Sequence, residues 1–69
     1  MSFPSYRIIR WNFEEPEEEA IFASFVYDGS KWWKLGTDES IPRALLMCKM
    51  HHKVEYGSRR FRVSLPKKV

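Results

Sequence analysis

Apolar side chains dominate residues 20–36, and they fall on both faces of a predicted β-hairpin. Asp28-Gly29 is a strong short-range signal for a hairpin turn, and runs rich in aromatic residues flank it. Because alternate side chains of a strand point to opposite faces, these runs build two apolar faces. A chain this short has few residues left to cover both apolar faces. We therefore expect one face to lie on the core and the other to meet a partner. The core-face residues are Phe22, Val26, Trp33 and Leu35, and those of the second face are Ile21, Phe25, Tyr27 and Trp32.

The acidic run before the hairpin leaves a second interpretation open for residues 16–27. Pro16 followed by three glutamates is typical of a helix start, and Gly29 would then follow the end of that helix. The fold would in that case alternate strands and helices. The aromatic and β-branched residues between positions 21 and 27 favour the hairpin.

Alternating apolar and polar residues predict two further strands, one near each end of the chain. The first covers residues 6–13. The second covers residues 58–65, where Arg60 and Arg62 alternate with apolar side chains, and residues 66–69 are expected to fray. The predicted core collects one face of each element and comprises Ile9, Trp11, Phe22, Val26, Trp33, Leu35, Ile41, Leu45, Cys48, Phe61, Val63 and Leu65.

A single helix is predicted over residues 41–55, with Ser40 or Asp38 as its N-cap and Gly57 at its end. One helix covers one face of a small sheet. We therefore predict an α+β fold for residues 1–69 as one small domain. Its antiparallel sheet has three to four strands, one helix packs on one face, and the order is β-β-β-α-β.

The composition is that of a folded chain, with 43% hydrophobic and 16% aromatic residues among 69. The one cysteine excludes an internal disulfide and fits a reducing compartment, so we expect a cytoplasmic protein. The N-terminus lacks the pattern of a signal peptide, and no apolar run approaches the length of a membrane span. We expect no membrane association.

Charge is distributed unevenly along the chain. Residues 1–40 hold four basic and eight acidic side chains, whereas residues 41–69 hold eight basic and one acidic. Such asymmetry is a hint of an anionic partner.

Catalytic and metal-binding signatures are weak in this sequence. Cys48 has helical spacing to His51 and His52, but structural zinc needs four ligands and no other cysteine or histidine is present. A cysteine nucleophile would also need a cleft, an orienting group and oxyanion donors. We predict a protein that is not an enzyme and has no catalytic residues, cofactor or metal site.

Two kinds of macromolecular partner fit the remaining pattern. Aromatic residues interleaved with Lys and Arg, as in residues 31–34 and 59–62, are typical of surfaces that stack bases and hold phosphates. In element order, three strands and then a helix, the chain resembles the DNA-binding domains of phage integrase arms and of plant DNA-binding factors. That resemblance implies nucleic-acid binding, which we keep as the alternative function.

Docking onto a larger protein is the function we rank first, because Trp, Tyr, Met and Arg are enriched at the centres of protein interfaces. The order of strand, hairpin, helix and strand is similar to that of small phage proteins that inhibit host RNA polymerase, which implies a regulatory inhibitor or modulator. Leu46, Met47 and Met50 on the helix form a second candidate patch, and a homodimer stays open. The predicted partner-binding residues are Phe25, Tyr27, Lys31, Trp32, Lys34, Arg60 and Arg62.

Overall fold

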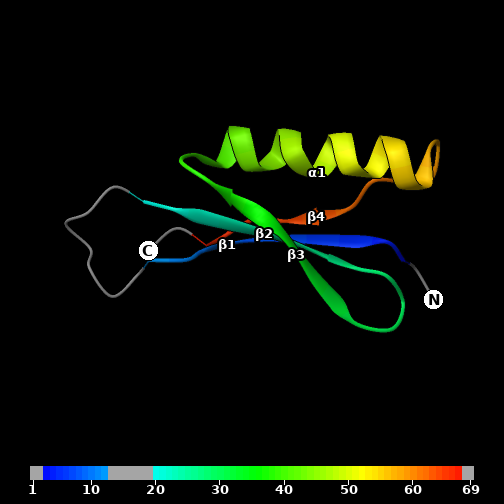
Figure 1. Ribbon diagram of the computed structural model, residues 1–69, viewed down its shortest axis with the longest axis horizontal. Coiled ribbons are helices and arrows are strands. Elements are labelled where there is room, and N and C mark those ends of the chain that lie inside the picture. Colours follow the sequence, from blue (N-terminus) through cyan, green and yellow to red (C-terminus); the bar gives the residue numbers. More distant parts are fainter. Residues whose placement is uncertain (1–2, 13–19, 68–69) are drawn as a thin grey trace.

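A four-stranded sheet with one helix packed against it makes up the fold (Figure 1). The computed structural model describes residues 3–12 and 20–67. This confirms the predicted α+β class and the order β-β-β-α-β. The elements are β1 (Ser5–Arg10), β2 (Phe22–Tyr27), β3 (Trp32–Asp38), α1 (Ile41–Tyr56) and β4 (Val63–Ser64).

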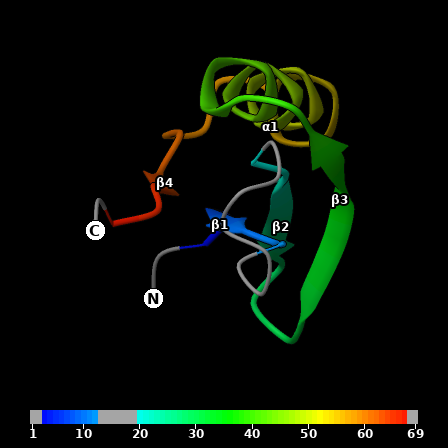
Figure 2. The same cartoon turned by 90° about the vertical axis from the view of Figure 1, so that its left-hand side faces the viewer.

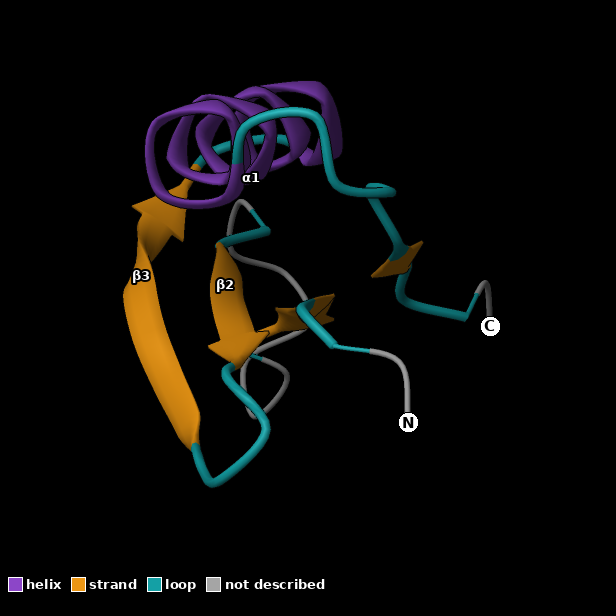
Figure 3. Cartoon of the chain, turned by 90° about the vertical axis from the view of Figure 1, so that its right-hand side faces the viewer, coloured by secondary structure: helices purple, strands orange, loops and turns teal. Residues whose placement is uncertain are grey.

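The strand order across the sheet is β3-β2-β1-β4. β1 pairs with β2, and β2 with β3, in antiparallel fashion, whereas β4 pairs with β1 in parallel. The edge strands β3 and β4 therefore run in the same direction, and α1 carries the chain across the sheet from one edge to the other (Figures 2 and 3). The sheet is therefore mixed, whereas the sequence predicted an antiparallel one. A helical crossover such as α1 joins two strands that run in the same direction, so β4 pairs in parallel with β1.

The hairpin is the correct interpretation of the segment before Asp28, since residues 22–27 form β2. The N–H of Asp28 donates to the carbonyl of Lys31 at 3.2 Å, so the central turn residues are Gly29 and Ser30. Gly29 has φ +98°, which favours glycine. The turn lies one residue later than the Asp28-Gly29 signal suggests, which shifts the pairing by two residues. A two-residue shift leaves the faces unchanged, whereas a shift of one would exchange them.

Local capping signals explain both ends of α1. The side-chain oxygen of Ser40 accepts the N–H of Arg43 at 3.3 Å, and Pro42 occupies the first turn, where its missing N–H has no cost. Gly57 ends the helix with φ +61°, and its N–H donates to the carbonyl of His52 at 3.0 Å. The predicted helix is confirmed with Ser40 as its N-cap.

The core lies between α1 and the sheet face beneath it. Its fully buried apolar members come from β1, β2 and α1, and partly buried residues of β2, β3, α1, β4 and the segment before β4 pack around them. The first group comprises Tyr6, Ile8, Val26, Ala44 and Cys48, and the second Phe22, Leu35, Leu45, Tyr56, Phe61 and Val63. Seven residues of the predicted core are in these groups.

The prediction for β1 is wrong about which face lies inward. Tyr6 and Ile8 are 0% and 1% exposed, whereas Trp11, placed in the core by the sequence pattern, is 47% exposed. Ile9 lies on the same outer face as Trp11, because it pairs with Ala23 between two inward-facing pairs. Both faces of this strand are apolar, so a period of two cannot tell them apart. Phe13, which the same alternation of residues 6–13 places on one face with Ile9 and Trp11, lies outside the described residues.

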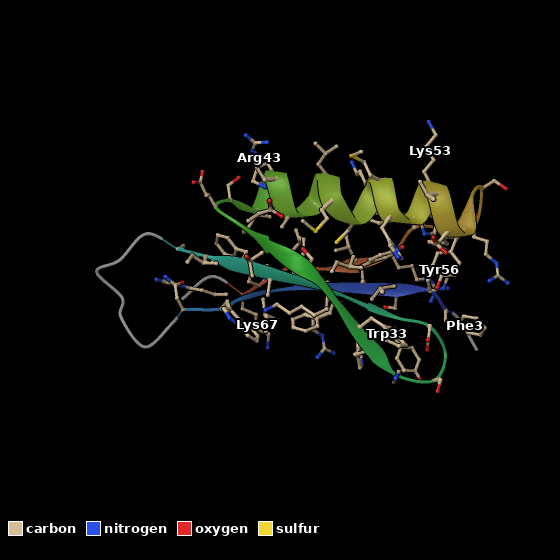
Figure 4. All side chains as sticks on the ribbon, viewed as in Figure 1. Phe3, Trp33, Arg43, Lys53, Tyr56 and Lys67 are labelled. Carbon is tan, nitrogen blue, oxygen red and sulfur yellow. The ribbon has the colours of Figure 1, made fainter. Side chains whose placement is uncertain are left out.

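Trp33 and Leu65 are also more exposed than predicted, at 48% and 50%. Trp33 is on the helix side of β3, but the twist of the sheet carries this end of the hairpin away from α1 (Figure 4). Its ring instead donates Nε1–H to Asp28 Oδ2 at 2.7 Å, and Lys31 Nζ lies 4.0 Å from the ring centroid. The last strand is much shorter than residues 58–65, because only Val63 and Ser64 pair with β1.

Tyr6 joins β1 to two other elements. Its hydroxyl lies 2.9 Å from Nδ1 of His51 on α1, and its N–H donates to the carbonyl of Arg62 at 2.9 Å. Its ring centroid lies 5.2 Å from that of Phe61 and 5.7 Å from that of His52. Burial raises the pKa of the phenol above its usual value, so Tyr6 stays neutral in its hydrogen bond with His51.

Replacement of Tyr6 should destabilise the fold in two steps. Tyr6→Phe removes a buried hydrogen bond without leaving a cavity and should lower the free energy of unfolding by about 1–2 kcal/mol. Tyr6→Ala also empties the site and should cost about 3–5 kcal/mol. Urea denaturation measures both, with Tyr27→Phe as the control, because that phenol lies on the uncovered face. Equal stability of Tyr6→Ala and the wild type would contradict this account of the core.

Asp28 should make the hairpin sensitive to acid. Its carboxylate accepts the N–H groups of Lys31 and Ser30 and the indole N–H of Trp33, and these bonds lower its pKa from 3.8 to about 2. A lowered pKa contributes stability that is present above pH 3.8 and is lost as pH falls through about 2. Asp28→Asn should therefore flatten the fall of unfolding free energy between these values. An equally steep fall in the variant would show that Asp28 is not the group responsible.

Candidate binding face

The sheet face opposite α1 carries a continuous group of aromatic and basic side chains, which we call the open face. Cross-strand pairing defines its members, since Arg7 lies opposite Phe25, Phe25 opposite Lys34, and Tyr27 opposite Trp32. The helix covers the other side of the sheet and leaves this one free of any described element (Figure 2). The open face comprises Arg7, Ile9, Trp11, Phe25, Tyr27, Trp32 and Lys34.

One aromatic–cation group lies at the hairpin end of the open face. The ring centroids of Tyr27 and Trp32 are 5.3 Å apart, with the planes tilted by 43°. The Arg7 guanidinium carbon lies 4.8 Å from the Trp32 ring centroid. Trp32 is 40% exposed, so a large part of its surface remains free for a ligand. A cation held over a ring is attracted by the ring quadrupole, so Arg7 is positioned before any ligand arrives.

A second group of the same kind lies toward the other end of the strands. The ring centroids of Trp11 and Phe25 are 6.0 Å apart, with an interplanar angle of 46°. Lys34 Nζ lies 4.3 Å from the centroid of the Trp11 ring. The open face therefore carries two separate groups, and each consists of an aromatic pair and one cation.

Both charged side chains of the open face are cationic. The described carboxylates lie elsewhere: Asp28 bonds to Trp33 on the helix side, and Asp38 pairs opposite Phe22 on that same side. Glu39 belongs to the turn before α1, and Glu55 to its last turn. Within residues 3–12 and 20–67, the open face therefore offers positive charge and apolar rings with no competing negative charge.

Four of the predicted partner-binding residues come together on the open face, and three do not. Phe25, Tyr27, Trp32 and Lys34 are neighbours there. Lys31 lies over Trp33, on the opposite side of the hairpin. Arg60 and Arg62 are exposed in the segment that leads into β4, outside the two aromatic–cation groups.

Three members of this face were not among the predicted site residues. Arg7 had no role in the prediction, and Ile9 and Trp11 were assigned to the core. The alternation of Arg7, Ile9 and Trp11 places all three on one side of a strand, so the sequence does group them. What the sequence does not give is which side of β1 the helix covers.

The residues considered for catalysis are engaged in the core. Burial raises the pKa of the Cys48 thiol, which lowers its reactivity. His51 Nδ1 forms a hydrogen bond with the Tyr6 hydroxyl, and His52 donates Nε2–H to the carbonyl of Arg59. His52 Nδ1 is buried and has no hydrogen-bond partner within the described part of the chain. The two histidines are therefore tied to other groups and not to the thiol.

The described residues hold neither a cluster of metal ligands nor a helix that could span a membrane. No three His, Cys, Asp or Glu side chains of this part of the chain lie close enough together to hold an ion. No helix in it has the length and apolar character that crossing a bilayer requires.

The open face thus presents two aromatic pairs, each with one cation over a ring. No protein-family model, curated protein or solved structure matches this chain.

Proposed function

We propose that this protein is a non-catalytic binding module whose open face takes single-stranded nucleic acid. The observation that carries the proposal is the pair of aromatic–cation groups, on a face with no carboxylate among its described residues. Unstacked bases lie on aromatic rings, and adjacent cations neutralise the phosphates between them.

The spacing of the two groups suits a chain of stacked bases. Tyr27 and Phe25 are two residues apart on β2, so their side chains leave the same face about 7 Å apart. Neighbouring bases of an extended single strand are separated by a similar distance. A rigid duplex keeps its bases stacked on one another, which makes the single strand the better ligand for such a face.

Docking onto a larger protein, the function ranked first from the sequence, is the second candidate. Half-exposed tryptophans next to arginine support it, because these residue types dominate interface hot spots. The uniform charge of the open face favours the nucleic acid, whose every repeat is anionic. A regulatory inhibitor of the phage type belongs to this second candidate. For either partner we expect binding in the cytoplasm, since a lone buried thiol suits a reducing compartment.

Two adjacent tryptophans give a matched test of the face. Trp32 and Trp33 are 40% and 48% exposed but lie on opposite sides of β3. Trp32→Ala should weaken the binding of a fluorescent mixed-sequence DNA or RNA single strand by roughly 5- to 150-fold, because one stacked base is worth about 1–3 kcal/mol. Trp33→Ala should leave the affinity unchanged. Fluorescence anisotropy at low salt measures both, with circular dichroism to confirm that each variant folds.

The salt dependence of the same binding tests the cations. Each phosphate contact to a single strand contributes about −0.7 to the slope of log K against log salt. Arg7→Gln and Lys34→Gln should each make that slope shallower by about this amount, whereas Lys31→Gln, on the other side, should not. Two results together would overturn the proposal in favour of protein docking. The first is that neither the DNA nor the RNA single strand binds at low salt. The second is that the wild type captures a stoichiometric protein that survives nuclease treatment, whereas Trp32→Ala does not capture it.

A further inference from the structure

A groove of about 540 Å³ runs along α1 on the opposite side of the molecule from the open face. Its apolar lining is a stripe at helical spacing, formed by Leu46, Met47, Met50 and Val54. Three of these are unusually exposed for apolar residues: Leu46 by 53%, Met50 by 62% and Val54 by 80%. The core does not use this side of the helix, because Ala44, Cys48 and His52 face the sheet.

Asp38, Arg43 and Glu55 are the charged side chains that line the groove, and the two on α1 are placed against the helix dipole. Arg43 is in the first turn of α1, where the helix end is positive, and Glu55 is in the last turn, where it is negative. Neither side chain forms an ion pair with another described residue. The two are twelve residues apart on one helix, about 18 Å along its axis, so they do not pair with each other. Lys53 in the last turn agrees with the dipole, so Arg43 and Glu55 are the charges of the groove that oppose it.

We infer that the groove holds α1 of a second copy of this chain, packed antiparallel in a two-fold symmetric dimer. In that arrangement the first turn of each helix meets the last turn of the other. Arg43 of one copy then faces Glu55 of the second copy, and the same pair recurs at the other end. Each charge also meets the helix end that stabilises it, the negative end for Arg43 and the positive end for Glu55.

The apolar stripe suits the same occupant. A two-fold interface requires a surface that is complementary to itself. A stripe of Leu, Met and Val with opposite charges at its ends meets that requirement, and unbranched methionines adapt to an irregular contact. The groove and the open face lie on opposite sides of the sheet, so loss of the dimer and loss of ligand binding are separate results.

Charge reversal tests the dimer without weakening the helix. Arg43→Glu and Glu55→Arg each place a charge in agreement with the helix dipole, so neither should unfold the monomer. Each variant alone creates two like-charged contacts in the dimer and should weaken self-association by roughly 10- to 100-fold. An equimolar mixture of the two variants has two opposite-charged contacts and should associate about as tightly as the wild type. Sedimentation equilibrium of the full chain at low salt measures all three.

Lys49→Glu is the matched control, since it reverses an exposed charge of the same helix outside the groove. It should leave the dissociation constant of the dimer unchanged. A wild-type chain that stays at its monomer mass of 8.3 kDa up to millimolar concentration would overturn the inference. So would a dimer that both single reversals leave intact, or a mixture that associates no better than either variant.

Discussion

Tyr6 is the point at which the sheet, the helix and the last strand meet, and the remaining structure depends on it. Its backbone lies between β2 and the segment that enters β4, and its side chain fills the space under the end of α1. The phenol is fully buried, and its one polar atom has a partner on the helix in His51. A buried polar group without such a partner is costly, so this hydrogen bond fixes how α1 lies across the sheet.

The position of α1 in turn decides which surfaces are left for binding. A chain with one helix covers one face of its sheet, and β3 and β4 are the edges between which that helix must cross. The aromatic residues of the second face have no described element above them. Their exposure follows from the topology, and it explains why cations lie over two of the rings: Arg7 and Lys34 shield surfaces that the fold does not bury.

Local signals were sufficient to predict the hairpin and the helix, because each is specified by residues close in sequence. Asp28-Gly29 marked the turn, and Ser40 and Gly57 marked the helix ends. The sides of the hairpin were also predictable, which placed Phe25, Tyr27 and Trp32 on one surface. The inner face of β1 was not, because Tyr6 and Ile8 are about as apolar as Ile9 and Trp11. The choice between them rests on a contact with His51, which lies 45 residues away.

The exposure of Trp33 was also not predicted, because the alternation of apolar and polar residues gives the side of a strand and not how deeply that side is buried. It points to the helix side as predicted, but β3 twists away from α1 before reaching it, so side and burial separate. Burial depends on how far the helix extends over each strand, and this is a property of the tertiary structure. The open face and the α1 groove share that origin, since both are apolar surfaces that one helix cannot cover. Because they lie on opposite sides, a dimer through α1 would leave two open faces free, and a single strand long enough to reach both would gain affinity from the linkage.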